Sequence, residues 1–205
     1  MILIMSLIGF FSGAIMFSYW LARLKGINLK EIREGNPGAF NLGYAAGLTY
    51  GILGASLDFL KGYLPAYYFA KVIGLDDSRI IFLALSPILG HAFSPFLKFK
   101  GGKALATTFG VWSALTKFQI SFFYAVILGI LKYIERKINK NKPSLPEIDA
   151  LLDLTGFGII GIILFVLQYS FILQQFWFYN LVLLIFKRIR DIHTLLSLVF
   201  KSEQS

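Results

Sequence analysis

The sequence predicts an all-α, polytopic integral membrane protein with about seven transmembrane helices, an external N-terminus and a cytoplasmic C-terminus. Of its 205 residues, 57% are hydrophobic and only 15% are charged, whereas a soluble domain carries about 25% charged residues. A soluble core of this size could not bury so much apolar surface, so lipid is its expected environment. The formal net charge of +9 would suggest nucleic acid for a soluble protein. In a membrane protein it indicates basic cytoplasmic loops, so no nucleic-acid partner is expected.

The apolar stretches define the expected helices, since a span needs about 20 mostly apolar residues. The first stretch has no basic segment before it and no clear cleavage site, which favours a retained helix over a signal peptide. The fourth is short, and the last is long enough for two helices with a turn near residues 168–175. The expected helical regions are Ile2–Leu21, Leu42–Ala70, Ile80–Leu97, Ala104–Leu115, Phe118–Ile134 and, as two helices, Leu154–Phe186.

Lysine and arginine set the predicted orientation. With the N-terminus outside, the cytoplasmic segments hold 16 basic residues and the external segments hold three, as the positive-inside rule requires. One cytoplasmic segment, Lys132–Asp153, carries Pro143 and Pro146 and is predicted to be a linker. No long repeat and no separate soluble domain is evident, so residues 1–205 are predicted to form a single transmembrane domain.

The segment Gly90–Lys103, GHAFSPFLKFKGGK, is the strongest candidate site. Glycine can bring its backbone N–H close to an anion or adopt positive φ, and successive N–H groups form an anion-binding nest. A helix starting at Ala104 would add a positive dipole end, and the lysines would add charge. We therefore expect a phosphate-binding loop on the cytoplasmic face rather than a merely basic loop. The Walker A spacing is absent, which argues against an ATPase.

Three further segments carry polar residues. The run EGNPGAFN, Glu34–Asn41, is predicted to be non-helical because of its glycines and proline. Its asparagines could bind a polar head group, although the composition alone favours a simple turn. Asp58 and Lys61 share a helix face within a span, where they either neutralise each other or serve a function. The basic tail IFKRIRDIHTL could lie on anionic lipid or reach a phosphate.

At these segments the chain resembles the bacterial membrane acyl-phosphate:glycerol-3-phosphate acyltransferases of the PlsY type. The run GHAFSPFLKFKGGKALAT is similar to the second motif of that family, EGNPGAFN to its first motif, and LDFLKG to the stretch that follows. The resemblance is clear from about Leu29 to Gly110. It implies seven helices, an external N-terminus and a cytoplasmic active site in the cell membrane, in agreement with the topology above.

The resemblance also implies a reaction. A fatty acyl group would pass from acyl phosphate to the 1-hydroxyl of glycerol 3-phosphate, giving lysophosphatidic acid for phospholipid synthesis. Because acyl phosphate is already activated, the protein would need only to position both substrates and stabilise developing charge. The implied catalytic residues are His91, Ser94 and Lys103, and the implied phosphate-binding residues are Asn36, Gly38, Asn41, Lys100, Gly101 and Gly102. No cofactor is expected, and the zero cysteine count with only two histidines argues against a metal site.

The chain departs from the family pattern in its first motif and near its C-terminus. Glu34 replaces a serine, Phe40 a threonine and Tyr44 an arginine, while Arg188 and Asp191 align with a histidine and an asparagine. These departures leave open a divergent paralogue that binds an acyl or lipid phosphate with another acceptor or without catalysis. A small transporter is a further alternative, although no internal repeat supports it.

Overall fold

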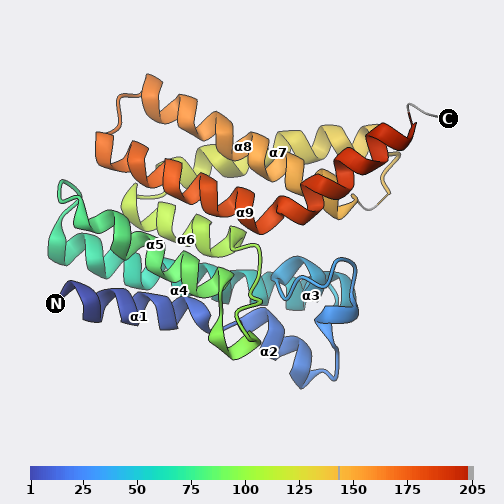
Figure 1. Cartoon of the computed structure of the whole chain (residues 1–205), viewed down its shortest axis with the longest axis horizontal. Coiled ribbons are helices and arrows are strands. Elements are labelled where there is room, and N and C mark those ends of the chain that lie inside the picture. Colours follow the sequence, from blue (N-terminus) through green and yellow to red (C-terminus); the bar gives the residue numbers. More distant parts are fainter. Residues whose placement is uncertain (143, 203–205) are drawn as a thin grey trace.

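The computed structural model describes residues 1–142 and 144–202, so Pro143 of the predicted linker lies outside the described residues. This part of the chain is helical and contains no strand. The long helices run side by side along the longest axis, and the start of α1 and the end of α9 lie at opposite ends of the molecule (Figure 1). The helices are α1 (Ile2–Ala14), α2 (Phe17–Leu24), α3 (Ala39–Ala46), α4 (Leu48–Ile73), α5 (Arg79–Ala92), α6 (Leu105–Leu115), α7 (Gln119–Ile138), α8 (Pro146–Val166) and α9 (Phe171–Ser202), with 3₁₀ turns at Leu29–Glu31 and Pro95–Leu97.

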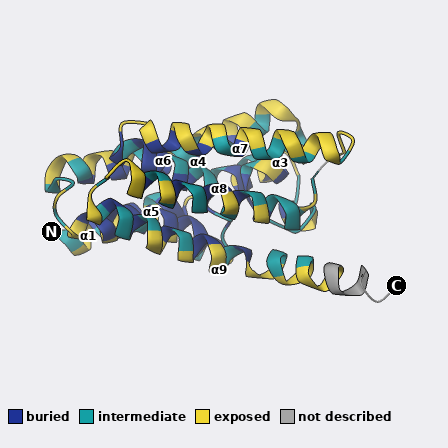
Figure 2. Ribbon diagram, turned by 90° about the horizontal axis from the view of Figure 1, so that it is seen from above, coloured by how far each residue is buried: buried dark blue, intermediate teal, exposed yellow. Residues whose placement is uncertain are grey.

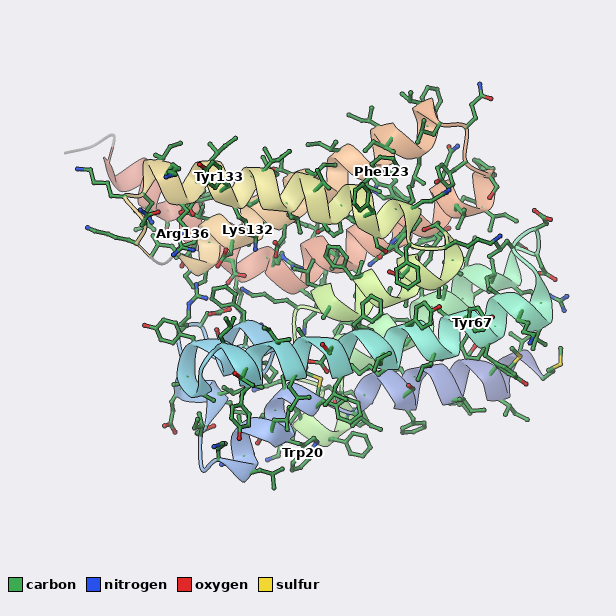
Figure 3. The ribbon with its side chains drawn as sticks, turned by 180° about the vertical axis from the view of Figure 1, so that it is seen from behind. Trp20, Tyr67, Phe123, Lys132, Tyr133 and Arg136 are labelled. Atoms are coloured by element: carbon green, nitrogen blue, oxygen red, sulfur yellow. The ribbon has the colours of Figure 1, made fainter. Side chains whose placement is uncertain are left out.

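The outer surface of the bundle is apolar over much of its length. Three described segments are long and apolar enough to cross a membrane: Ile2–Leu24, Arg79–Leu97 and Pro146–Val166. Large side chains such as Trp20, Tyr67 and Tyr133 project from the surface (Figure 3). The buried residues gather along the middle of the bundle, whereas the C-terminal part of α9 extends beyond it (Figure 2). Exposed apolar surface on this scale marks contact with lipid.

The first predicted helix is broken between α1 and α2. Ile15 is extended there, with φ −68° and ψ 109°, so its carbonyl accepts from the Phe17 N–H at 3.2 Å instead of making a regular helical hydrogen bond. The ammonium of Lys61 donates to that carbonyl at 2.6 Å and pairs with Asp58 at 2.7 Å. Asp58 also accepts from the Ser18 hydroxyl at 2.6 Å. The shared face of Asp58 and Lys61 is thus confirmed, and the buried pair joins α4 to the helix break.

Replacing Lys61 with methionine is expected to destabilise the protein by about 3–5 kcal/mol, because the Asp58 carboxylate would remain buried without its countercharge. The carbonyl of Ile15 would also lose the hydrogen bond from the Lys61 ammonium. Thermal unfolding in detergent measures the effect. Lys71→Met, at an exposed position of the same helix, is the control and should unfold like the wild type. An equal unfolding temperature for Lys61→Met would contradict this role.

The second predicted helix is also interrupted. Gly47, with φ 94° and ψ 163°, separates α3 from α4, and only glycine adopts this conformation readily. A Cβ on Gly51 would lie 2.7 Å from the Cα of Gly43, so α3 folds closely onto the start of α4. The prediction of one helix from Leu42 to Ala70 is therefore wrong at its start. The run EGNPGAFN is non-helical only as far as Gly38, because α3 begins at Ala39.

The prediction that Lys132–Asp153 is a linker is wrong for most of that segment. The helix α7 continues to Ile138, and α8 begins at Pro146. Proline is favoured at the first helical position, and Glu147 and Asp149 in the first turn complement the helix dipole. Charged residues therefore extend these two helices instead of ending them.

The C-terminal region forms one helix rather than a span followed by a surface segment. The turn before α9 occupies residues 167–170, slightly earlier than predicted, and α9 then runs without interruption from Phe171 to Ser202. The predicted placement of the basic tail on lipid is wrong for Arg188, which is 1% exposed. Its burial within the bundle brings α9 to the site described below.

Glycines set the spacing of the helices that carry the site. A Cβ on Gly13 of α1 would lie 1.9 Å from the backbone oxygen of Pro87 on α5. On α4, a Cβ on Gly62 would lie 2.5 Å from the backbone oxygen of Thr107 on α6. Small residues allow such close approach in membrane bundles. The first contact sets the spacing of α1 and α5, and the second holds α4 and α6 close enough for Thr107 to reach the backbone of Asp58.

Candidate functional site

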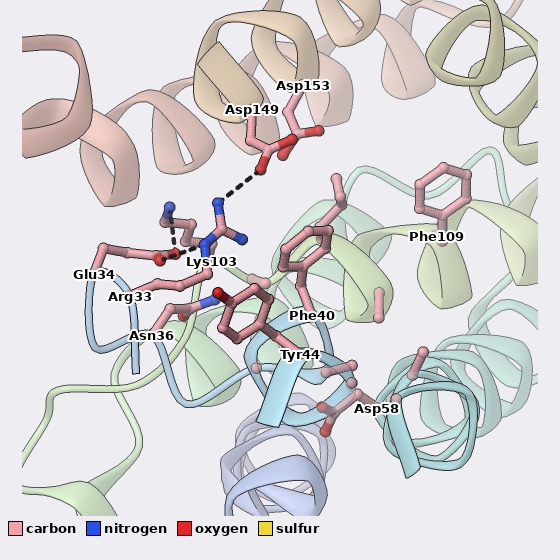
Figure 4. Close-up of a pocket in the computed structure, with 18 of the residues that line it drawn as sticks. Arg33, Glu34, Asn36, Phe40, Tyr44, Asp58, Lys103, Phe109, Asp149 and Asp153 are labelled. Carbon is pink, nitrogen blue, oxygen red and sulfur yellow. Dashed lines mark hydrogen bonds and ion pairs between the residues drawn. The ribbon is translucent and has the colours of Figure 1, made fainter. Parts of the chain in front are cut away.

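A cavity of about 600 Å³ opens between the first loop (residues 25–38, between α2 and α3) and the helices α3 to α9. Figure 4 shows charged side chains gathered on one side of it and Phe109 on another. The polar lining comprises Arg33, Glu34, Asn36, Asp58, His91, Lys103, Lys132, Asp149, Asp153 and Arg188. The remaining lining is mostly small or apolar and includes Gly38, Phe40, Leu48, Gly51, Ile52, Ala55, Leu105, Ala106 and Phe109. The cavity can therefore hold an anionic group beside an apolar one.

The Gly90–Lys103 segment is partly helical. The helix α5 continues through His91 to Ala92, and α6 starts at Leu105 after Ala104, close to the predicted start. The paired glycines are required by close packing rather than by positive φ. A Cβ on Gly101 would lie 1.9 Å from the backbone oxygen of His91, and one on Gly102 would lie 2.4 Å from its Nε2. The loop is thus folded tightly around His91.

The His91 imidazole lines the cavity and is held by Thr107. Its Nδ1 lies 3.1 Å from the Thr107 hydroxyl, which donates to the backbone oxygen of Asp58 at 3.0 Å. Because that hydroxyl has one hydrogen and gives it to Asp58, its oxygen accepts from Nδ1–H of the imidazole. In a neutral ring this arrangement leaves the lone pair on Nε2. This fixed orientation suits an imidazole that positions a ligand.

Lys103 stands where the loop meets α6, and its ammonium contacts two carboxylates. It lies 3.0 Å from Glu34 in the first loop and 2.8 Å from Asp191 on α9. Its backbone oxygen accepts a hydrogen bond from Arg188 at 3.1 Å. Lys103 therefore links three segments that are distant in sequence, and it places one positive charge at the cavity near the N-terminus of α6.

The other sequence candidates lie around the cavity rather than in it. The Ser94 hydroxyl donates to the backbone oxygen of Ala14 at 2.7 Å, which ties the loop to the end of α1. The Asn41 amide donates to the backbone oxygens of Ile32 and Asn36 at 3.0 and 3.1 Å and so shapes the first loop. Lys100 is exposed. Of the nine candidates, Asn36, Gly38, His91 and Lys103 line the cavity, whereas Ser94, Asn41, Lys100, Gly101 and Gly102 are not among its lining residues.

A network of ion pairs at the cavity was not anticipated from the sequence. Asp149 contacts Arg33 at 3.3 Å and Lys132 at 3.5 Å. Asp153 contacts Lys132 at 3.1 Å and Arg188 at 2.9 Å. The partners are up to 116 residues apart in the sequence, so no local sequence pattern could reveal these ion pairs. The only available signal was the clustering of charge in Lys132–Asp153, which had suggested a linker.

Glu34 is ionised at neutral pH. Burial raises the pKa of its carboxyl, but the positive charge of Lys103, a backbone hydrogen bond and the charge of Arg33 together lower the pKa below its ordinary value of 4.5. The cavity therefore contains its own anion beside Lys103.

Comparisons with known proteins agree with one another. The sequence model of the family described as glycerol-3-phosphate acyltransferase matches residues 3–198. The chain is 48% identical over 155 residues to glycerol-3-phosphate acyltransferase 1 of Thermotoga maritima. The aligned region covers 75% of this chain and 76% of that protein. It is 42% identical over 118 residues to glycerol-3-phosphate acyltransferase of Aquifex aeolicus, covering 58% and 62% of the two chains.

Solved structures show the same similarity in three dimensions. The fold matches the crystal structure of PlsY, an integral membrane glycerol 3-phosphate acyltransferase, in its glycerol 3-phosphate form. The TM-score is 0.83 and the identity 31%, over 96% of this chain and 92% of that chain. The lysophosphatidic acid form of the same protein matches with a TM-score of 0.82.

Proposed function

The chain belongs to the glycerol-3-phosphate acyltransferase family, and on that premise we propose that it transfers a fatty acyl group from acyl phosphate to the 1-hydroxyl of glycerol 3-phosphate. It is an integral membrane acyltransferase of phospholipid synthesis. The proposal adds the donor, the residues that act on the substrates and the side of the membrane on which they act.

The single observation that supports acyl phosphate as the donor is the polar and apolar character of the cavity lining. Lys103 and Arg33 stand on its polar side, and Ile52, Ala55 and Phe109 stand on its apolar side. An acyl phosphate has one anionic end and one long apolar end, so it matches both sides at once. Asn36 and Gly38 also line the cavity, where they could contact a small, polar acceptor.

The reaction needs positioning and electrostatic stabilisation rather than a covalent enzyme intermediate. The 1-hydroxyl oxygen of glycerol 3-phosphate attacks the acyl carbonyl carbon, and the bond from that carbon to the phosphate oxygen breaks. Inorganic phosphate leaves and the hydroxyl proton departs with it, giving lysophosphatidic acid. Lys103 neutralises phosphate charge and His91 orients a substrate. Asn36 and Gly38 contribute polar contacts, while Ser94, Asn41, Lys100, Gly101 and Gly102 act through the shape and charge of the surrounding loops.

A donor comparison tests the proposal. Purified protein in detergent is given glycerol 3-phosphate with either palmitoyl phosphate or palmitoyl-CoA, and lysophosphatidic acid is quantified. We expect product from the acyl phosphate and little from the thioester, because the thioester carries a bulky nucleotide in place of a small phosphate. Equal use of the two donors would contradict the proposed donor, and absence of product from both would contradict the reaction.

We further propose that the chain is a single domain with seven spans in the plasma membrane, an external N-terminus and a cytoplasmic site. The distribution of basic residues supports this orientation. The chain has no cysteine, so single cysteines can report on it. Lys98→Cys, beside the cavity loop, and Lys117→Cys, at the α6–α7 turn, are matched exposed positions with positive φ. In intact cells a membrane-impermeant maleimide should label only Lys117→Cys, and the reverse pattern would contradict the orientation.

A further inference from the structure

The Glu34 carboxylate lies between two cations at the cavity. One oxygen contacts the Lys103 ammonium at 3.0 Å, and the other lies 3.9 Å from Nε of Arg33. The second distance is longer than a charge-assisted hydrogen bond, which spans about 2.7–2.9 Å. The carboxylate therefore occupies a position between Lys103 and Arg33 without satisfying both. A phosphate group has three terminal oxygens and could contact the two cations together.

Arg33 is held at this position by contacts on several sides. Its guanidinium lies 4.5 Å from the centre of the Phe40 ring, a favourable arrangement for a cation over an aromatic face. Its Nη2 donates to the backbone oxygen of Ser144 at 2.8 Å and to Asp149 at 3.3 Å. Those are the hydrogen bonds that Arg33 makes among the described residues, so Nε and Nη1 can still bind an acceptor. The side chain is only 11% exposed and lines the cavity.

The backbone of Arg33 is also unusual. Its φ is 51°, a left-handed conformation that costs a non-glycine residue roughly 1–2 kcal/mol. Such conformations persist where the surrounding structure enforces them. Here the contacts with Phe40, Ser144 and Asp149 hold the guanidinium at the cavity in spite of that cost.

We propose that a substrate phosphate binds between Lys103 and Arg33 and displaces the Glu34 carboxylate, so that Arg33 determines substrate affinity and Glu34 opposes it. The inference rests on the proposed function. A phosphate monoester carries a charge of about −1.5 to −2 at neutral pH, which one lysine cannot balance. Arg33 supplies the second positive charge and a planar set of donors that suits phosphate.

This arrangement accounts for three departures from the family pattern together. Tyr44 stands where the family has an arginine, and Arg33 brings a guanidinium to the same cavity from the first loop. Phe40, in place of threonine, provides the ring against which Arg33 packs. Glu34, in place of serine, holds the two cations while no substrate phosphate is bound.

Steady-state kinetics of three variants test the proposal. Arg33→Met should raise the KM of glycerol 3-phosphate or of acyl phosphate by about tenfold to a hundredfold, as expected for loss of a hydrogen bond to a charged group, with a smaller change in kcat. The KM of Arg33→Lys should lie between those of Arg33→Met and the wild type. Lysine keeps the positive charge but lacks the planar set of N–H donors of a guanidinium. Glu34→Gln should lower the same KM. The substrate whose KM responds identifies which phosphate binds there.

Arg23→Met is the matched control, since Arg23 is an exposed arginine that also packs over an aromatic ring, that of Tyr19, 5.6 Å away. Its two KM values should equal those of the wild type. If the wild type forms lysophosphatidic acid but Arg33→Met has the same KM values as Arg23→Met, the role of Arg33 is overturned and the proposed function stands.

A binding measurement separates this inference from the reaction itself. Inorganic phosphate should raise the thermal unfolding temperature of the wild type and of Arg23→Met in detergent, and should raise that of Arg33→Met much less. Unfolding without phosphate shows whether each variant is folded. Equal protection of Arg33→Met and Arg23→Met would overturn the inference. Protection that depends on Arg33 would support it even if the wild type formed no lysophosphatidic acid, an outcome that would contradict the proposed function alone.

Discussion

Replacing Lys103 with methionine is expected to reduce kcat/KM for lysophosphatidic acid formation by about 10²–10³, the usual cost of removing one charge-stabilising donor from an active site. The ammonium contacts Glu34 at 3.0 Å and Asp191 at 2.8 Å. Its removal would leave both carboxylates without that countercharge. A bound phosphate would then meet net repulsion instead of attraction. Initial rates with purified protein measure the loss.

The matched control is Lys117→Met, which removes a lysine from the α6–α7 turn, outside the cavity lining. It should retain the wild-type rate. The unfolding temperature of each variant shows whether a loss of rate reflects a loss of fold. A Lys103→Met variant that stays folded and keeps a rate within about threefold of the wild type, far less than the expected loss, would show that Lys103 does not act on the substrates.

A second large effect, a loss of both stability and activity, is expected for Gly101→Ala. The added Cβ would lie 1.9 Å from the backbone oxygen of His91 and 2.9 Å from that of Ala92, and backbone atoms cannot move aside as a flexible side chain can. Overpacking of this kind typically costs about 1–3 kcal/mol. The variant should unfold at a lower temperature and lose activity, because the loop from α5 to α6 would shift away from His91.

Gly129→Ala is the control for that substitution. Gly129 lies within α7, and a Cβ there would meet no atom within 4 Å. Alanine favours helix over glycine by about 1 kcal/mol, so this variant should be as stable as the wild type or more stable. A Gly101→Ala variant with unchanged stability and activity would show that the loop is not packed as tightly as described.

Hydrophobicity located the helices but not the breaks within them. The apolar run Ile2–Leu21 gives no sign that Ile15 is extended, because the break depends on Lys61 from a distant helix. Gly47 separates α3 from α4, yet glycines recur throughout the spans and mark no single position. Charged residues in Lys132–Asp153 suggested a linker, but pairing with Arg33 and Arg188 allows them to lie on helices at the cavity.

The candidate site was predictable where its residues are close together in the sequence. The run from His91 to Lys103 lies at the cavity, with its two ends in the lining. Arg33 was not singled out, because its role depends on Phe40, Asp149 and the Ser144 carbonyl, which only the folded chain brings to it. Arg188 appeared in the sequence as part of a basic tail, and its burial follows from the uninterrupted course of α9.

Family membership favours the acyltransferase over the two alternatives that the sequence left open. The departures Glu34, Phe40 and Tyr44 had suggested a divergent paralogue. Their positions around Arg33 and Lys103 instead suggest a rearranged phosphate site. The Asp58–Lys61 pair, for which the sequence left a structural and a functional role open, contacts the α1–α2 break.

The most direct test of the central claim is the stoichiometry of the reaction. Purified protein is supplied with acyl phosphate and glycerol 3-phosphate, and lysophosphatidic acid and inorganic phosphate are measured in the same samples. Transfer at the cavity predicts equal amounts of the two products, with phosphate release depending on glycerol 3-phosphate. Phosphate release that does not require glycerol 3-phosphate, with no lysophosphatidic acid formed, would contradict it, because the acyl group would then be passing to water.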